Sequence, residues 1–290
     1  YEISLGLVGS EMCIRDSLSC VRSVAFTDIN NKEGALTMKF DVYGVTDTGC
    51  VRQLNEDNFC ICGFENNNEP GYCVVADGMG GHNAGEVASQ LAIDFITESL
   101  NDILQNSENP DVPRRINDAL NSANESIYKM AREDKNRNGM GTTTVICTFA
   151  NGEGYIANVG DSRAYACRND EIYQITIDHS IVEEMVANGS ITREEARVHP
   201  QKNIITRAIG SEKTTKADIF EYEYKPGDSI IICSDGLSGM VEDATILKTV
   251  QDGKSSKEIA DNLCELAKKN GGVDNITVIA IRIMEEESSI

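Results

Sequence analysis

The chain has 290 residues, of which 40% are hydrophobic, a size that suits one large domain or two small ones. Its 26 Lys and Arg residues face 47 Asp and Glu residues, and the net charge of −21 argues against binding to nucleic acid or an anionic membrane. The longest apolar runs, such as residues 229–233, fall far short of the ~20 residues that cross a bilayer.

The cysteine pattern predicts reduced thiols. The chain has ten cysteines but no CxxC pair, and Cys73, Cys147 and Cys233 lie in apolar runs, where cysteine acts as a small hydrophobic residue. We therefore expect a cytoplasmic protein without disulfides.

The first 37 residues differ from the rest of the chain. Residues 7–17 (LVGSEMCIRDS) resemble the translation of a transposase adapter used in sequencing libraries, and the basic start and long apolar stretch of a signal peptide are missing. We predict that residues 1–17 are an adapter-like, non-native segment and that residues 18–37 are an uncertain leader. Met38 is a candidate for the native start.

Three amphipathic helices are predicted. Apolar residues recur at every third or fourth position in residues 87–96 and 116–130. Asp111 and Pro113 suit the start of the second helix. Further along, Ser255 and Glu258 have capping-box spacing, and Gly271 can end that third helix.

Strands are predicted between the second and third helices. Residues 143–150, 155–159, 163–167 and 171–176 are apolar or β-branched, and the turn pairs Asn151-Gly152 and Asn169-Asp170 separate them. This pattern predicts an antiparallel β-meander.

A polar, irregular insert, residues 178–221, follows these strands. Gly189 predicts the end of a short helix, and Thr192 with Glu195 predicts a turn. Inserts of this length in a compact domain are often functional, and a decorative loop is the alternative.

Acidic residues mark the edges of the predicted strands. These residues are Asp77, Asp161 and Asp235 after apolar runs, Asp274 before one, and Glu56 and Asp57 before another. A single Asp-Gly after a strand is usually a turn, but several such edges are less easily explained as independent turns. If they converge, the carboxylates repel one another in a low dielectric, and divalent cations would remove that cost.

The donor set favours one class of metal. The ligands would all be oxygen atoms without a His/Cys cluster, which favours Mg²⁺ or Mn²⁺ over zinc. A glycine after Asp77 would let a backbone carbonyl approach a metal.

The chain resembles the metal-dependent (PPM, type 2C) serine/threonine protein phosphatases, especially the compact bacterial members. The segments that carry the resemblance follow the family's order across residues 38–283. They are Thr46-Asp47-Thr48-Gly49, Arg52, Asn55-Glu56-Asp57, Asp77-Gly78-Met79-Gly80-Gly81-His82, Gly85-Glu86, Ala88-Ser89, Gly139-Met140-Gly141-Thr142-Thr143, Asn158-Val159-Gly160-Asp161-Ser162-Arg163, Asp178-His179-Ser180, Ser234-Asp235-Gly236-Leu237 and Asp274-Asn275-Ile276-Thr277-Val278.

The resemblance implies an α+β fold, a four-layer αββα sandwich in which two antiparallel β-sheets are flanked by helices. Residues 38–285 would form the catalytic domain, and residues 178–221 would match the family's variable flap. The implied reaction is hydrolysis of phosphoserine or phosphothreonine by a metal-activated water, without a covalent phospho-enzyme.

The resemblance also assigns roles to residues. Asp77 would bridge two Mn²⁺ or Mg²⁺ ions, with the carbonyl of Gly78 on one of them. Asp235 and Asp274 would hold the other ion. Glu56 and Asp57 would support the second metal partly through water. Asp161, with Asp235, would build a third, weaker site, and Arg52 would bind the substrate phosphate.

One departure concerns the general acid. Many eukaryotic members carry a histidine directly after the Asp-Gly pair, where this chain has Met79. His82 is near in sequence but is expected to be structural, and a metal-bound water is the alternative acid.

The implied partners are phosphorylated proteins, among them a serine/threonine kinase and its substrates, and we expect a monomer. A small anti-sigma-type regulator is an alternative substrate, and an inactive phosphatase-like binding module is a further alternative, which the intact aspartates disfavour. The Gly253-Lys254-Ser255 segment lacks the earlier glycine of a phosphate loop, and no Gly-x-Ser-x-Gly motif supports a serine hydrolase.

Overall fold

The computed structural model describes residues 38–64, 70–81, 84–105, 111–134 and 137–285. Contacts divide the chain into two units, residues 1–35 and 36–290, and every described residue belongs to the second. The predicted adapter-like segment, the predicted leader and His82 lie outside the described residues.

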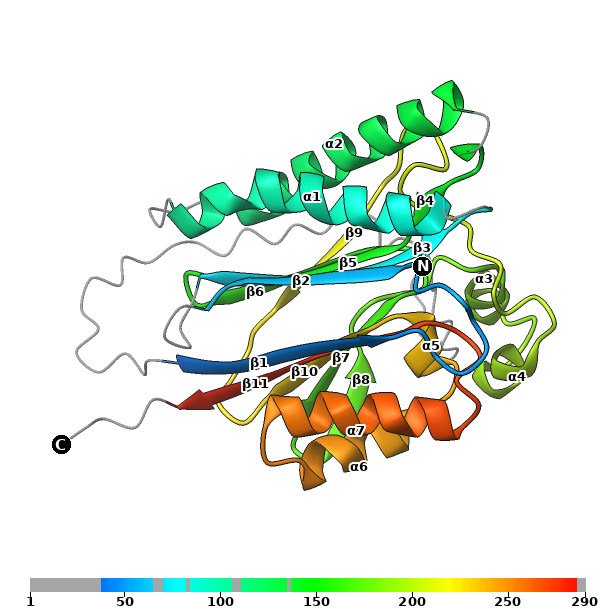
Figure 1. Cartoon of the computed structure of the whole chain (residues 1–290). Coiled ribbons are helices and arrows are strands. Elements are labelled where there is room, and N and C mark those ends of the chain that lie inside the picture. Colours follow the sequence, from blue (N-terminus) through cyan, green and yellow to red (C-terminus); the bar gives the residue numbers. More distant parts are fainter. Residues whose placement is uncertain (1–37, 65–69, 82–83, 106–110, 135–136, 286–290) are drawn as a thin grey trace, which may run out of the picture. The chain divides into compact units, whose positions relative to one another are not determined.

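Two antiparallel sheets form the centre of this unit (Figure 1). The first, sheet A, has the order β1-β11-β10-β7-β8. Its strands are β1 (Met38–Asp47), β11 (Ile276–Glu285), β10 (Ser229–Cys233), β7 (Arg163–Arg168) and β8 (Glu171–Gln174). The first and last described strands are neighbours here, because β1 pairs with β11 along its whole length, from Met38 opposite Glu285 to Asp47 opposite Ile276.

The second sheet, sheet B, has the order β2-β3-β5-β6-β9, with β4 paired to the end of β3. Its strands are β2 (Asp57–Gly63), β3 (Gly71–Met79), β4 (Gly141–Thr142), β5 (Thr144–Ala150), β6 (Glu153–Val159) and β9 (Asp218–Tyr222). Alternation along β3 decides which side chain enters which core. Tyr72 and Val74 face the helices, whereas Cys73 and Val75 face the core between the sheets.

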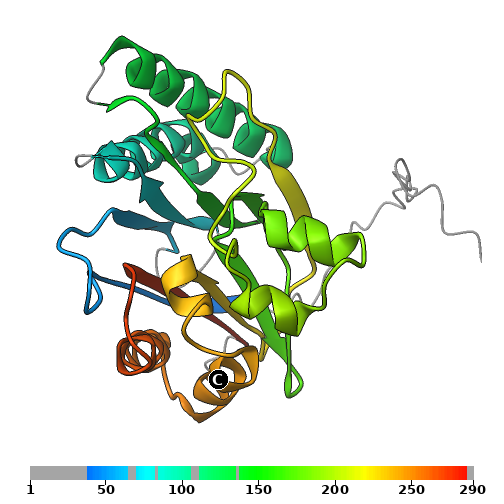
Figure 2. The same ribbon diagram turned by 90° about the vertical axis from the view of Figure 1, so that its right-hand side faces the viewer.

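Helices cover the outer face of each sheet (Figures 1 and 2). Helices α1 (Ala84–Gln105) and α2 (Val112–Glu133) pack on sheet B, and α6 (Asp243–Asp252) and α7 (Ser256–Lys269) pack on sheet A. The predicted αββα sandwich is therefore confirmed. Within the described ranges, no helix is both long and apolar enough to span a bilayer.

Local capping signals place the helix ends as predicted. The Asp111 side chain accepts a hydrogen bond from the backbone of Arg114 at the start of α2. The Ser255 hydroxyl accepts one from the Glu258 backbone at the start of α7. Both caps satisfy backbone N–H groups that a helix leaves unpaired.

The insert contains α3 (Ile181–Ala187) and α4 (Arg193–Val198), and its last residues begin β9. The predicted short helix before Gly189 is present. The predicted turn at Thr192 is instead the start of α4, because Thr192 and Glu195 complete a reciprocal capping box that begins a helix.

The predicted β-meander is wrong in one respect. The hairpin β5-β6 lies in sheet B, the hairpin β7-β8 lies in sheet A, and the chain crosses between the sheets at residues 160–162. Gly160 has φ +114°, and a Cβ there would lie 2.6 Å from the Thr143 side chain. Turn residues predict each hairpin, but they do not predict which sheet a hairpin joins.

Candidate metal centre

Two of the predicted acidic residues face each other across a strand pair of sheet B. Asp57, the first residue of β2, lies directly opposite Asp77 near the end of β3. Residues opposite each other share a face of the sheet. Asp77 lies two residues after Val75 and therefore on the same face of β3, and Val75 lies in the core between the sheets. Both carboxylates thus turn toward the space between the sheets.

Sheet A brings two further acidic residues to the same end. Asp235 opens the short helix α5 (Asp235–Ser238) directly after β10, and Asp274 lies just before the neighbouring strand β11. The two segments are tightly packed, because a Cβ on Gly236 would lie 1.9 Å from the Asn275 carbonyl oxygen.

The Asp57 carboxylate joins the two sheets. Its Oδ2 accepts hydrogen bonds from the hydroxyls of Ser234 (2.8 Å), the residue after β10, and Thr277 (2.7 Å), the second residue of β11. Asp57 is only 4% exposed, so these bonds cross the interior of the molecule. They hold sheet B and sheet A together at the acidic end.

The crossover segment adds Asp161, which is 9% exposed. The hydroxyls of Thr143 and of Ser162, the residue after Asp161, lie 2.7 Å apart. The Thr143 hydroxyl also accepts a hydrogen bond from the backbone N–H of Asp77 at 3.2 Å. A short hydroxyl chain therefore connects the backbone positions of Asp77 and Asp161.

Glu56 is held against the start of α1. Its carboxylate accepts a hydrogen bond from the Gly85 backbone in the first helical turn, where the helix dipole favours negative charge. Its carbonyl accepts one from the Gly78 backbone N–H at 3.1 Å. The approach requires glycine, since a Cβ on Gly78 would lie 2.1 Å from the Gly85 carbonyl oxygen.

The predicted phosphate-binding residue contacts a predicted metal ligand. Arg52 Nη2 donates a hydrogen bond to Asp274 Oδ2 at 2.8 Å. The Arg52 side chain is 49% exposed and that of Asp274 is 25% exposed. The guanidinium therefore lies at the solvent border of the acidic cluster.

The acidic cluster raises the pKa values of its own carboxyls. Burial, followed by repulsion from the other four aspartates of the cluster, raises the pKa of Asp77 well above its ordinary range. Burial is also the main cause for three other residues, and repulsion from neighbouring aspartates adds to it. The pKa is raised to about 7 at Asp57, about 8 at Asp161 and about 6 at Asp235.

These properties fit divalent cations bound through oxygen. Asp57 Oδ1 is buried and has no hydrogen-bond partner, which is costly for a carboxylate unless a cation compensates it. Within the part of the chain that the structure describes, no three acidic, histidine or cysteine side chains form a ready metal cage. Asp57 accepts hydrogen bonds from Ser234 and Thr277, and Asp274 accepts one from Arg52.

Several residues that support the cluster have no predicted role. Asn275 is the main one: its amide donates to the carbonyls of Thr48 (3.0 Å) and Leu54 (2.9 Å), and its Oδ1 accepts from the Glu56 N–H (2.9 Å). Asn275 thereby fixes the loop that carries Arg52. The available signal was its place within the Asp274-Asn275 motif, but contacts over more than 200 residues are not visible in a sequence.

The insert is anchored beside the cluster. Arg163 donates to both carboxylate oxygens of Asp178, at 2.7–3.0 Å, at the insert's start. The neighbouring His179 accepts a hydrogen bond from the Gly160 N–H on Nδ1 (3.0 Å), and its Nε2 lies 3.0 Å from Asp218 at the insert's end. Both ends of the insert are thus attached next to Asp161.

The position of the expected general acid holds a residue that cannot supply a proton. Met79 is half-buried, and its Cε lies 2.9 Å from where a Cβ on Gly141 would be. A thioether has no proton to donate.

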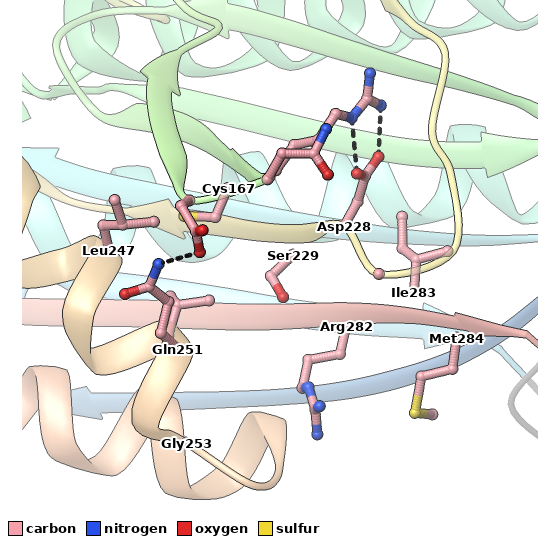
Figure 3. Close-up of a pocket in the computed structure, with 14 residues that line it drawn as sticks. Cys167, Asp228, Ser229, Leu247, Gln251, Gly253, Arg282, Ile283 and Met284 are labelled. Atoms are coloured by element: carbon pink, nitrogen blue, oxygen red, sulfur yellow. Dashed lines mark hydrogen bonds and ion pairs between the residues drawn. The ribbon is translucent and has the colours of Figure 1, made fainter.

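A cavity of about 330 Å³ lies at the other end of sheet A (Figure 3). Its lining includes Cys167, Ser229 and Arg282, which are directly opposite one another on β7, β10 and β11. Arg168 and Asp228, which form an ion pair, also line it, and Figure 3 labels Asp228. None of the predicted metal ligands lines this cavity, so it is separate from the candidate centre.

Comparisons with known proteins agree with the fold. A model of the family described as protein phosphatase 2C matches residues 41–276. The serine/threonine phosphatase stp of Listeria innocua is 38% identical over 236 residues, which are 81% of this chain and 93% of that protein. A crystal structure of the Mycobacterium tuberculosis serine/threonine phosphatase PstP/Ppp has a TM-score of 0.76 and 35% identity, covering 86% of this chain and 100% of that one.

A second solved structure concerns metals. It is the catalytic domain of the serine/threonine protein phosphatase PstP in complex with two manganese ions, with a TM-score of 0.75 and 34% identity over 86% of this chain and 100% of that one. The chain described here belongs to the protein phosphatase 2C family.

Proposed function

We propose that the acidic end of the two sheets is the active centre at which this chain hydrolyses phosphoserine and phosphothreonine in other proteins. The chain is a metal-dependent serine/threonine protein phosphatase. We propose that residues 38–285 form its catalytic domain. The observation that carries the proposal is the convergence of buried carboxylates from both sheets, whose pKa values are raised by burial and by repulsion from one another.

The metal ligands are the predicted set. They are Glu56, Asp57, Asp77, the Gly78 carbonyl, Asp161, Asp235 and Asp274. These oxygen donors suit two or three Mn²⁺ or Mg²⁺ ions. When bound, the cations supply a water of lowered pKa as nucleophile and offset the charge of the phosphoryl oxygens.

Arg52 orients the substrate. Its guanidinium lies at the solvent border and is held there by Asp274. Arg52 would bind two oxygens of the substrate phosphate, which the planar guanidinium fits and a lysine does not. We expect Arg52→Lys to raise KM for a phosphopeptide more than it lowers kcat.

The surroundings of the centre favour protein substrates. The insert, residues 178–221, is attached beside Asp161. The positive charge of Lys202 within it offsets part of the rise in the pKa of Asp235. We propose that the insert contacts phosphorylated proteins, including a kinase and its substrates, and that a small anti-sigma-type regulator is an alternative substrate. We also propose that the chain is cytoplasmic, in line with the free thiols of all the described cysteines. We further propose that it is a monomer.

The test is hydrolysis of a phosphothreonine peptide by residues 38–290, with Mn²⁺, with Mg²⁺ and with EDTA. We expect metal-dependent release of phosphate that EDTA abolishes and that Asp235→Asn removes. No release by the folded protein with either metal would instead favour an inactive binding module.

A further inference from the structure

Two loops at the border of the candidate centre present apolar side chains to solvent. One joins β1 to β2 (residues 48–56) and contains Arg52, and the other joins α7 to β11 (residues 270–275). We use the name apolar rim for four residues of these loops and of the turn after α5: Cys50, Val51, Met240 and Val273. Val51 is 64% exposed and Val273 is 49% exposed, although both are large apolar side chains.

The apolar rim is held in place by short contacts. The Cys50 backbone N–H donates to the Gly272 carbonyl at 2.7 Å, so the two loops lie side by side, as Figure 2 shows from this end. The Asn270 amide donates to the Met240 carbonyl at 2.8 Å, which attaches the turn to the second loop. A surface that is ordered before binding loses little entropy when a partner docks.

The exposed large hydrophobic residues are unevenly distributed. Among the described residues there are six, and Val51 and Val273 lie on the apolar rim. Val198 and Ile204 lie on the insert, Ile177 lies directly before it, and Tyr173 is the remaining one. Isolated exposed hydrophobic residues are normal, but Val51 and Val273 lie on two adjoining loops, and adjoining apolar side chains at the surface mark a binding site more often than isolated ones do.

The charges next to the apolar rim are mainly negative. Asp274, Glu56 and Asp47 lie on or beside the two loops, and Lys268 is offset by ion pairs with Asp47 (3.0 Å) and Glu265 (2.6 Å). Acidic residues of a partner would therefore be repelled here. Arg52 provides the attraction for a phosphate.

We propose that the apolar rim binds apolar side chains directly before and after the phosphorylated residue of a protein substrate. The inference rests on the proposed function, because it places the phosphate at Arg52. Val51 is the residue directly before Arg52, and neighbouring Cα atoms are about 3.8 Å apart in enzyme and substrate alike. A phosphate at Arg52 thus brings the neighbouring substrate residues over Val51 and Val273, and the partner is a segment with apolar, non-acidic flanks.

The test compares two phosphothreonine peptides, one with leucine and one with aspartate on both sides of the phosphothreonine, with an aryl phosphate as reference. We expect the wild type to prefer the leucine peptide by about tenfold in kcat/KM, the effect of burying part of one apolar side chain. Val51→Asp and Val273→Asp should each lower the ratio of kcat/KM for the leucine peptide to that for the aryl phosphate about tenfold.

Three further variants identify the cause. Val51→Ser should lower the same ratio less than Val51→Asp, because it removes apolar surface without adding charge, and Val51→Leu should retain the ratio. Ser122→Asp adds the same charge on the exposed face of α2 and should leave the ratio unchanged. An unchanged peptide preference in Val51→Asp and Val273→Asp, or an equal loss in Ser122→Asp, would overturn the proposal. Failure of the proposed function can be told apart from failure of this proposal, since the wild type would then not hydrolyse the aryl phosphate at all.

Discussion

Two buried aspartates at opposite ends of the molecule have opposite pKa shifts. Asp57 is 4% exposed and Asp228 is 2% exposed, so burial alone would raise both pKa values. At Asp57 burial dominates, and the pKa rises to about 7. At Asp228 burial is outweighed by hydrogen bonds from Arg168, from the Lys225 backbone and from Tyr222, and the pKa is lowered.

The difference lies in the partners. Asp228 has a guanidinium 2.5 Å away and forms a complete ion pair inside the protein. Asp57 has two hydroxyl donors, one oxygen without a partner, and other aspartates nearby. The Asp228 end is therefore complete as folded, whereas the Asp57 end requires positive charge from outside the chain.

The largest expected effect is on activity. Asp235→Asn should lower metal-dependent phosphatase activity by at least about 10²–10³-fold, the loss typical of removing one electrostatic group from an active site. Asp228→Asn should leave kcat/KM within about twofold of the wild type below its unfolding temperature, because Asp228 lies at the other end of sheet A. Steady-state kinetics of both variants on an aryl phosphate checks the prediction, and a comparable loss in both would contradict it.

The second effect is on stability without metal. Asp228→Asn should lower the free energy of unfolding by roughly 2–3 kcal/mol, because it leaves Arg168 without its ion pair. Asp57→Asn should instead raise it in EDTA near pH 8, because it removes a buried charge that has only hydroxyl partners. Urea unfolding in EDTA measures both, and destabilisation of equal size in both variants would show that Asp57 is not held under electrostatic strain.

Much of the fold, and the ligand set proposed for the centre, could be predicted from the sequence, because their signals are local. Asp111 caps α2 within three residues, and the predicted metal ligands lie at or next to the ends of strands. The partners of Asp57 were not predictable in this way, because Ser234 and Thr277 lie 177 and 220 residues further along the chain. The crossing at Gly160 was missed for the same reason, since a hairpin pattern does not identify its sheet.

The third effect is on the pH dependence of stability. The folded pKa values of Asp57, Asp161 and Asp235 are about 7, 8 and 6, and all lie above the unfolded value of about 3.9. Raised folded values stabilise the protein fully below the unfolded pKa, and that contribution is lost as pH rises through the folded pKa. The metal-free protein should therefore lose stability from about pH 4 to about pH 8.

Asp228 contributes with the opposite sign. Its lowered folded pKa adds stability above the unfolded value, and this is lost as pH falls. Urea unfolding in EDTA at several pH values, for the wild type and Asp57→Asn, separates the two contributions. A wild-type stability that increases from about pH 5 to about pH 8 in EDTA would contradict the raised values.

The smallest expected effect concerns the insert. Exchanging the part of the insert that carries α4 for that of a relative keeps the anchors Asp178, His179 and Asp218. We expect kcat/KM to change several-fold on phosphoproteins and by less than about twofold on an aryl phosphate, because the anchors beside Asp161 remain. Equal changes on both substrates would show that the insert acts on the centre rather than on substrate choice.

Calorimetric titration of Mn²⁺ into the metal-free protein tests most directly whether the buried carboxylates form a divalent cation site. The titration should be made near pH 6.5 in two buffers of different ionisation enthalpy. We expect at least two Mn²⁺ per chain, with proton release in the wild type because the carboxyls of Asp57 and Asp161 are still partly protonated there. Proton release should persist in Asp228→Asn and decrease in Asp57→Asn. Mn²⁺ binding without proton release, or no Mn²⁺ binding by the folded protein, would show that these buried carboxyls do not form the cation site.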